Sequence, residues 1–156
     1  MPKSTEIRLT FSESITACLT GAMRHLESIY KKRQPRFPEK YPGQLLLNHI
    51  HGAAAECAYA KYADKYWGSH VNRFHRPDVG CVEVRFSNTG ALKIRPDEEG
   101  WVVLISGSFP NFIFGGAIHA EKGKRAEWLK DPGGWGAPAY FIPQPELQQE
   151  IPDVRT

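Results

Sequence analysis

The stretch that decides the fold spans residues 76–85 and reads Arg76-Pro77-Asp78-Val79-Gly80-Cys81-Val82-Glu83-Val84-Arg85. From Val79 to Phe86 the residues alternate loosely and are rich in valine, which predicts a β-strand. Asp78 then lies at the start of this strand and Glu83 lies within it. Because side chains alternate along a strand, Arg85 points to the same face as Glu83. Two carboxylates and a cation are therefore expected close together.

Carboxylates in this arrangement are suited to a hard divalent cation. Mg²⁺ prefers oxygen ligands and is usually held by one or two carboxylates together with substrate phosphate. Asp78 and Glu83 supply that number, and the backbone carbonyl of Val84 is a candidate third ligand. A bound metal would activate a water molecule for attack on phosphorus and neutralise charge on the phosphoryl oxygens. The expected cofactor is Mg²⁺, or Mn²⁺ in its place.

Working upstream, residues 44–66 predict a helix that is buried on almost all sides. Its central apolar face carries Leu46, Ile50, Ala53, Ala54 and Cys57, with Glu56 at the edge of that face. An unpaired buried carboxylate is unfavourable, so Glu56 requires a partner. That partner is either the proposed metal, an arginine in an ordinary salt bridge, or solvent that the side chain reaches.

Downstream, short strands follow one another. Residues 91–95 are predicted to form a hairpin with the strand at 79–86, joined by a turn at 87–90. Residues 101–106 are apolar enough for a central strand buried on both faces. A strand at 112–120 contains Gly115 and Gly116, which indicate a bulge or a close backbone approach. A short helical or irregular segment at 121–130 and a last strand at 139–142 complete the pattern.

The N-terminal part predicts a short strand at 6–11 and an amphipathic helix at 13–31 that begins with Ser12 as its cap and Glu13 in its first turn. The positions expected to face the core are Ile15, Leu19, Ala22, Met23, Leu26, Ile29 and Tyr30. A proline-rich basic loop follows at 31–43. It is either a solvated connection or an arm that contacts phosphates. The C-terminal segment 145–156 is expected to be poorly ordered or to lie along the surface.

Bulk composition is that of an ordinary globular domain. The chain has 156 residues, of which 41% are hydrophobic and 24% charged, with a net charge of +3. One domain spanning 1–156 is expected, because this length supports a single core. The three cysteines are widely spaced, which predicts reduced thiols and a cytoplasmic protein. No apolar run is long enough to span a membrane.

This pattern resembles the PD-(D/E)xK nuclease superfamily. The resemblance rests on Pro77-Asp78, on Glu83-Val84-Arg85 and on a preceding helix that carries Glu56. It implies an α/β (α+β) fold of the restriction-endonuclease type, with a central mixed β-sheet flanked by helices. The shared core would cover about residues 44–142, with an extra N-terminal strand and helix at 5–32 and a tail at 145–156.

The family assigns each motif residue a role. The resemblance implies that Asp78 and Glu83 bind the metal, that Glu56 assists metal binding, often through water, and that the basic residue, here Arg85, positions the nucleophilic water. It implies hydrolysis of DNA phosphodiester bonds by a small nuclease of phage or bacterial type. Many such nucleases act as dimers, so a homodimer is compatible with the resemblance. A virus-encoded protein would act in the cytoplasm of its host.

One motif position departs from the family. Arg85 stands where the family has lysine, and a guanidinium that stays protonated cannot act as a general base, although it can orient phosphate. Lys93 is a candidate substitute, because a three-residue loop would place it opposite Arg85 across the predicted hairpin. A two-residue loop would turn Lys93 to the other face.

Other functions stay open. The protein can be a catalytically inactive member of the fold that binds nucleic acid or a protein partner, as Arg85 would allow. A third possibility is that these acids have only a structural role and that the protein is an inhibitor or assembly factor of a virus. A zinc site formed by His49, Glu56 and a histidine of the 67–76 loop is a further alternative.

Overall fold

The computed structural model describes residues 5–35, 37–71 and 77–153. Its elements in chain order are β1 (Glu6–Arg8), α1 (Phe11–Tyr30), α2 (Gln44–Ala63), β2 (Val82–Phe86), β3 (Ala91–Ile94), β4 (Trp101–Ser108), β5 (Asn111–His119), α3 (Ala120–Gly123), the 3-10 helix η1 (Ala126–Trp128), β6 (Leu129–Lys130), β7 (Ala139–Pro143) and the 3-10 helix η2 (Gln144–Glu146). The broad prediction of an α+β protein with a mixed sheet and helices is confirmed.

The strands form two sheets. The first has the order β1-β5-β4-β2, in which β1 and β4 are antiparallel to β5, whereas β2 runs parallel to β4. The second has the order β3-β7-β6 and is antiparallel. Residues 102–105 of β4 are fully buried, and β4 lies inside the first sheet. The prediction of a central strand buried on both faces is therefore confirmed.

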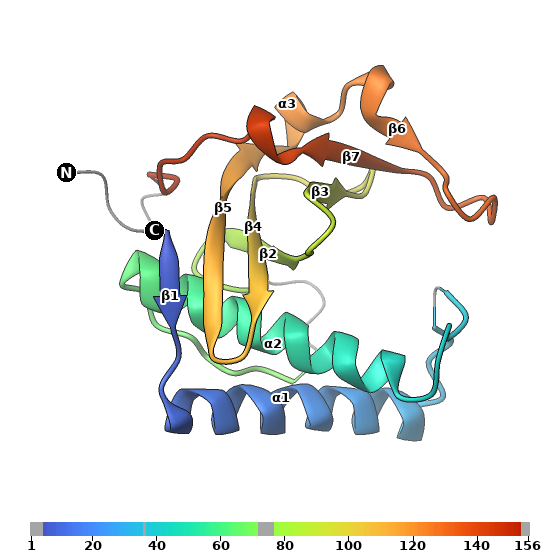
Figure 1. Ribbon diagram of the computed structural model, residues 1–156. Helices are drawn as coiled ribbons and strands as arrows, with labels where there is room; N and C mark the ends of the chain where they lie inside the picture. The colour runs from blue at the N-terminus through green and yellow to red at the C-terminus, as the bar shows by residue number, and fades with distance from the viewer. Residues whose placement is uncertain (1–4, 36, 72–76, 154–156) are drawn as a thin grey trace.

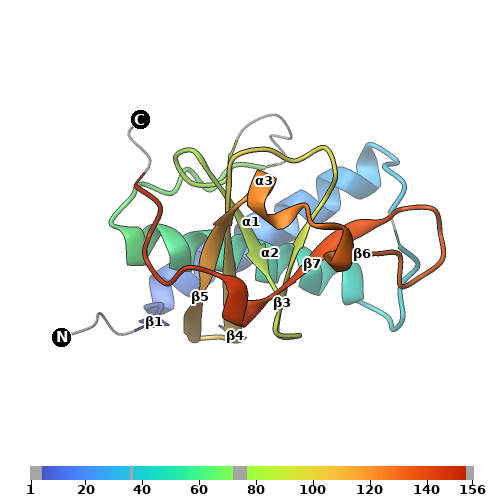
Figure 2. The ribbon, with the colours of Figure 1, turned by 90° about the horizontal axis from the view of Figure 1, so that it is seen from above.

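The elements are stacked in layers. Figure 1 shows α1 on the outside, α2 between α1 and the first sheet, and the second sheet at the opposite end of the molecule. In Figure 2, seen from above, β6 and β7 lie toward the viewer and the two long helices lie behind the strands. Val103 and Ile105 of β4 join the core that contains α2, whereas Val102 and Leu104 join the core beneath the second sheet. Because side chains alternate along β4, one strand serves both cores.

Small side chains bring the two long helices together. Residues 53–60 of α2 are all buried, and most of them are alanine. On α1 the buried residues are Ala17, Thr20 and Gly21. A Cβ atom at Gly21 would overlap the backbone of Ile50, so the contact requires glycine on α1. The helices therefore pack at close range through small residues.

The predicted orientation of α1 is wrong. The large apolar residues of α1 that were expected to face the core are exposed, and its small residues face α2 instead. The predicted cap is also displaced by two residues. Thr10 is the N-cap, because its hydroxyl accepts a hydrogen bond from the backbone N–H of Glu13 while the Glu13 carboxylate accepts one from the N–H of Thr10.

The predicted hairpin of the 79–86 and 91–95 strands is also wrong. β2 pairs with β4, with Arg85 opposite Leu104, whereas β3 pairs with β7 in the second sheet, with Lys93 opposite Phe141. The side chain of Asn88 explains part of this divergence, because it bonds both the carbonyl and the N–H of Gly107 at the end of β4. The turn at 87–90 is thereby held against β4, and the chain leaves the first sheet after it.

Two further predictions are confirmed. The β4–β5 register shifts at Gly115, since Leu104 pairs with Gly116 and the next residue pairs with Phe114. The described part of the C-terminal segment lies along the protein, where Gln148 bridges to Ala117 and Leu147 is buried. Among the described residues, no helix is long and apolar enough to cross a membrane.

Candidate active site

A tight turn places Asp78 beside the first strand of the motif. Val79 and Val82 exchange backbone hydrogen bonds of 3.1 and 2.9 Å across Gly80 and Cys81, and Gly80 has the positive φ of 58° that this turn requires. The Asp78 carboxylate then accepts a hydrogen bond of 2.7 Å from the N–H of Val84. Asp78 is therefore fixed at the open edge of β2.

The Val84 carbonyl points toward the same edge. In a strand the N–H and C=O of one residue lie on the same side, and the N–H of Val84 binds Asp78 rather than β4. β2 is the edge strand of its sheet. This orientation is compatible with the predicted role of the Val84 carbonyl as a ligand.

The buried Glu56 and the half-buried Asp78 lie close enough for the charge of Asp78 to act on Glu56. Glu56 is 6% exposed. Burial raises the pKa of Glu56 to about 7, and the charge of Asp78 adds to the rise while Arg24 opposes it. Burial and the charge of Glu83 raise the pKa of Asp78 to about 6.

Arg24 neutralises Glu56 from the neighbouring helix. Its Nη1 and Nη2 atoms donate to the two oxygens of Glu56 at 3.0 and 2.7 Å, and its Nε donates to the carbonyl of His70 at 2.7 Å. The indole N–H of Trp67 donates to Glu56 at 3.1 Å. Both carboxylate oxygens of Glu56 are therefore engaged within the chain.

Glu83 and Arg85 lie on the face of β2 opposite Val82 and Val84, as the alternation predicts. The Nη1 atom of Arg85 lies 3.5 Å from the Glu83 carboxylate, and its Nη2 contacts the carboxylate of Glu98. Glu98 also binds Arg95 at 2.8 Å. Arg85 is therefore held between two acids, one from the predicted motif and one from the turn before β4.

The structure thus brings four of the predicted site residues together and separates the fifth. Glu56, Asp78, Glu83 and Arg85 are near enough for their charges and hydrogen bonds to affect the pKa of Asp78. Lys93 belongs to β3 in the second sheet, where its Nζ lies 4.5 Å from the centre of the Phe37 ring. The cross-strand pairing with Arg85 that made Lys93 a catalytic candidate does not form.

The donor set fits a divalent cation held by two carboxylates. Asp78 and Glu83 are the candidate direct ligands, whereas Glu56 can act only through water while Arg24 and Trp67 bind its oxygens. In the described ranges, no three His, Cys, Asp or Glu residues are grouped so that they could hold a metal ion by themselves. A site of this kind needs substrate phosphate to complete its coordination. The described ranges hold no such group for the zinc alternative either, and His75 lies outside them.

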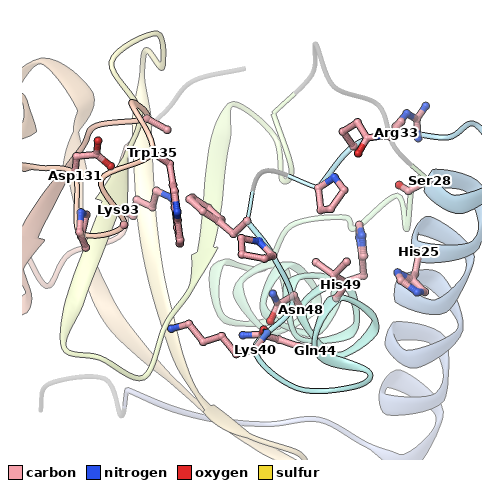
Figure 3. Close-up of a pocket in the computed structure, with 18 of the residues that line it drawn as sticks. His25, Ser28, Arg33, Lys40, Gln44, Asn48, His49, Lys93, Asp131 and Trp135 are labelled. Atoms are coloured by element: carbon pink, nitrogen blue, oxygen red, sulfur yellow. The ribbon is translucent and has the colours of Figure 1, made fainter.

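A pocket lies elsewhere, lined by residues of α1, α2, β3, β7 and two loops, and none of its described lining residues is Glu56, Asp78, Glu83 or Arg85. It has a volume of about 650 Å³, which lies within the range of small-molecule sites. Figure 3 shows His25 of α1 and His49 of α2 on one side, with Lys93, Asp131 and Trp135 on the other. His25 directly follows Arg24 in α1. Burial lowers the pKa of His49, and the charges of His25 and Arg24 lower it further. The pocket therefore adjoins the helix that binds Glu56.

The walls of the pocket combine aromatic rings with cations. The ring centres of Phe37 and Trp135 lie 5.1 Å apart. Lys93 lies over the Phe37 ring. Trp135 is 54% exposed, so part of its ring remains accessible. Further lining residues include Arg33, Lys40 and Phe141. Such a surface can accept a planar ring that carries negative charge.

The sequence offers three basic segments, 31–40, 73–76 and 122–125, as candidates to contact phosphate, and the described ones have different surroundings. In 31–40, Lys31 and Arg33 pair with Glu27 on α1, whereas Lys40 lines the pocket. Arg125 in 122–125 lies over the ring of Trp128. Residues 73–76 lie outside the described ranges.

Sequence reasoning missed Arg24, Trp67 and Glu98, which bind the predicted acids and base. A signal for Arg24 exists, because Ala17, Gly21 and Arg24 follow helical spacing along the small-residue face of α1. Comparisons with protein-family models, with curated proteins and with solved structures find no match to this chain.

Proposed function

We propose that the protein is a metal-dependent nuclease that hydrolyses DNA phosphodiester bonds, with a core of the restriction-endonuclease type. The observation that supports this proposal is that Asp78, in the turn before β2, lies close enough to Glu56 of α2 and to Glu83 of β2 for the charges in each pair to interact. Bringing acids together is unfavourable for stability, because their charges repel and lose hydration. A site that binds a cation gives this arrangement a function.

The acids and the edge strand have separate tasks in this proposal. Asp78, which the N–H of Val84 holds in place, and Glu83 would bind Mg²⁺ or Mn²⁺ together with the Val84 carbonyl. The bound ion would activate water and neutralise charge on the phosphoryl group. Glu56 would orient a water of the site, and Arg24 keeps its carboxylate fixed.

Arg85 supplies a fixed positive charge next to the acids. A guanidinium can hold two oxygens of a phosphate at once, but it does not accept the proton of the attacking water. Arg85 therefore serves to position phosphate, and the proton must pass to a carboxylate or to solvent. Because Arg85 contacts Glu98 and Glu83, its side chain is preorganised on the face that carries Glu83.

The pocket beside α1 offers a place for one nucleotide of the DNA. A base would stack on Trp135 or Phe37, and its phosphate would lie near Lys40 or Lys93. Stacking of this kind contributes about 1–3 kcal/mol per base. Because only an unstacked base can enter, the pocket favours a single-stranded region of the substrate.

The test is cleavage of end-labelled single- and double-stranded DNA with Mg²⁺, with Mn²⁺ and with EDTA. Wild-type protein should cut only with metal, and Asp78→Asn and Glu83→Gln should each lose at least about a hundredfold in rate. Asp97→Asn, which removes an exposed acid of a turn outside the cluster, should cut normally. Full activity in both Asp78→Asn and Glu83→Gln would refute the proposal.

A second candidate function is supported by Arg85. Since Arg85 replaces the family's lysine and is paired with Glu98, the protein can be an inactive nuclease that binds DNA or a protein partner in the cytoplasm. Its three cysteines are all free thiols, which suits a reducing compartment. DNA binding that weakens with salt but is unchanged by EDTA, without cleavage under any divalent ion, would favour this function.

A further inference from the structure

The outer face of α1 is covered with large apolar side chains. Of thirteen exposed large hydrophobic residues in the described ranges, seven lie on this one helix. We call them the α1 stripe: Phe11, Ile15, Leu19, Met23, Leu26, Ile29 and Tyr30. Leu19 is 60% exposed and Tyr30 is 84% exposed. Scattered exposed hydrophobic residues are normal, but a concentration on one helix indicates a binding surface.

These side chains are exposed in the monomer, and one of them, Ile29, also lines the pocket. α1 already packs on α2 through Ala17, Thr20 and Gly21, on its opposite face. That close packing requires glycine at position 21, since any Cβ there would overlap Ile50. Figure 1 shows α1 as the outermost layer, with α2 between it and the strands. The larger apolar face therefore points away from the protein.

The spacing on this face of α1 matches a helix–helix seam. Four residues of the α1 stripe, Ile15, Leu19, Leu26 and Ile29, together with the half-buried Ala22, follow one another at alternating steps of four and three residues. Such a repeat averages 3.5 residues and keeps apolar side chains facing one partner helix along its length. A helix of 20 residues is about 30 Å long, so the seam is long enough for an interface.

The exposed area has the size of a dimer interface. With roughly 200 Å² for each large side chain, the exposed fractions of the α1 stripe amount to on the order of 900 Å². A typical monomer exposes no apolar patch above about 300–600 Å², whereas a stable interface buries about 800 Å² per partner. The exposed area of the α1 stripe therefore exceeds the largest apolar patch of a typical monomer and reaches the area that each partner buries in a stable interface.

The charges around the α1 stripe are compatible with a second copy as its partner. The α1 stripe holds no charged residue, and the nearby Glu13, Arg24 and Glu27 are paired with Lys61, Glu56 and Lys31 of the same chain. No charge on this face therefore calls for an opposite charge on a partner, and two identical faces meet without like-charge repulsion. A membrane-bound helix would instead carry lysine or arginine along its polar face.

From these observations we propose that two copies of the protein form a symmetric dimer through the α1 stripe. The interface is isologous, so the same residues of both copies contact each other about a two-fold axis. The axis passes near Ala22, which is the middle of the five seam positions. The dimer does not depend on the proposed nuclease activity, and a catalytically silent protein would form it equally.

The test compares the wild type with Leu19→Glu/Leu26→Glu by light scattering after gel filtration and by sedimentation. Wild-type protein should have about twice the mass of the 17.6-kDa chain. The double variant should be monomeric with an unchanged circular dichroism spectrum, because both side chains are exposed in the monomer. Leu47→Glu, which changes an exposed leucine of α2, should remain a dimer. Affinity in the double variant should fall by at least about a hundredfold.

A crosslink reports on the position of the seam. Ala22→Cys in a background of Cys18→Ser and Cys81→Ser should form a disulfide between two copies under mild oxidation, because Ala22 meets its symmetry mate. Wild-type protein that stays monomeric at about 100 μM, a concentration at which even micromolar affinity gives dimers, would overturn the proposal. So would a monomer that binds phospholipid vesicles through the α1 stripe, or a dimer that Leu19→Glu/Leu26→Glu leaves intact.

Discussion

The guanidinium of Arg24 in α1 binds both carboxylate oxygens of Glu56 in α2, through Nη1 at 3.0 Å and Nη2 at 2.7 Å. This pair joins the outermost helix to the acid cluster, because the charge of Asp78 also acts on Glu56. The helix that carries the exposed apolar stripe therefore also supports the candidate active site.

Loss of Arg24 should destabilise the protein strongly. Arg24→Ala leaves Glu56 buried without its cation, which should lower the free energy of unfolding by about 3–5 kcal/mol. The surface pair Lys61–Glu13 provides the control, since Lys61→Ala should lower it by less than about 1 kcal/mol. Urea denaturation measures both values. Equal small losses would show that the Arg24–Glu56 pair behaves as an ordinary surface salt bridge.

Glycine substitutions in the two helices should have opposite effects. Gly21→Ala introduces a Cβ that overlaps Ile50, so it should push the helices apart and destabilise the protein by about 1–3 kcal/mol. Gly52→Ala, within α2, meets no atom within 4 Å and should stabilise it by about 0.5–1 kcal/mol. Thermal unfolding of the two variants compares them directly, and similar shifts in both would contradict the close helix contact.

Stability should fall as pH rises when metal is absent. The pKa of Glu56 rises from 4.5 to about 7 and that of Asp78 from 3.8 to about 6 on folding. Between the ordinary and the raised values the folded protein holds more protons than the unfolded chain, so the free energy of unfolding decreases with pH.

Urea denaturation in EDTA between about pH 4 and pH 7 measures this slope. Asp78→Asn removes one of the two carboxyls and should flatten the slope, whereas the exposed Asp97→Asn should preserve it. A stability that instead rises over this range would mean that the carboxyls are ionised and stabilised in the folded protein.

The pocket should contribute to DNA affinity through Trp135. Trp135→Ala should weaken binding of a short single-stranded oligonucleotide by about 1–3 kcal/mol, roughly 5- to 150-fold. Gly133→Ala should weaken it as well, because its Cβ would overlap the Trp135 ring. Tyr66→Ala, which removes an aromatic ring that is 88% exposed outside the pocket, should bind like the wild type. Fluorescence anisotropy in EDTA separates binding from cleavage.

The residue pattern predicted the positions of the strands better than it predicted which strands pair with each other. The valine-rich run at β2, the apolar run at β4 and the glycines of β5 identify strands because each reports on local burial or backbone shape. The partner of β2 depends on where the chain goes after Asn88, which bonds to Gly107 nineteen residues later. Local alternation carries no information on such a choice, so the β2–β3 hairpin was mispredicted.

The same limit explains α1 and the pocket. Periodicity found the apolar face of α1, but it does not say whether the chain itself or another molecule covers that face. The small residues Ala17 and Gly21 were the overlooked sign of the packed side. The pocket joins Phe37 to Trp135, which lie far apart in the sequence, so only the fold could reveal it.

The most direct test of the proposed metal site is to measure Mn²⁺ binding by electron paramagnetic resonance in the presence of a phosphorothioate-containing oligonucleotide. Wild-type protein should bind the ion, Asp78→Asn and Glu83→Gln should lose this binding, and Asp97→Asn should keep it. Cleavage of ordinary DNA should follow the same order. Absence of Mn²⁺ binding by wild-type protein, or equal binding by Asp78→Asn, would contradict a metal site formed by Asp78 and Glu83.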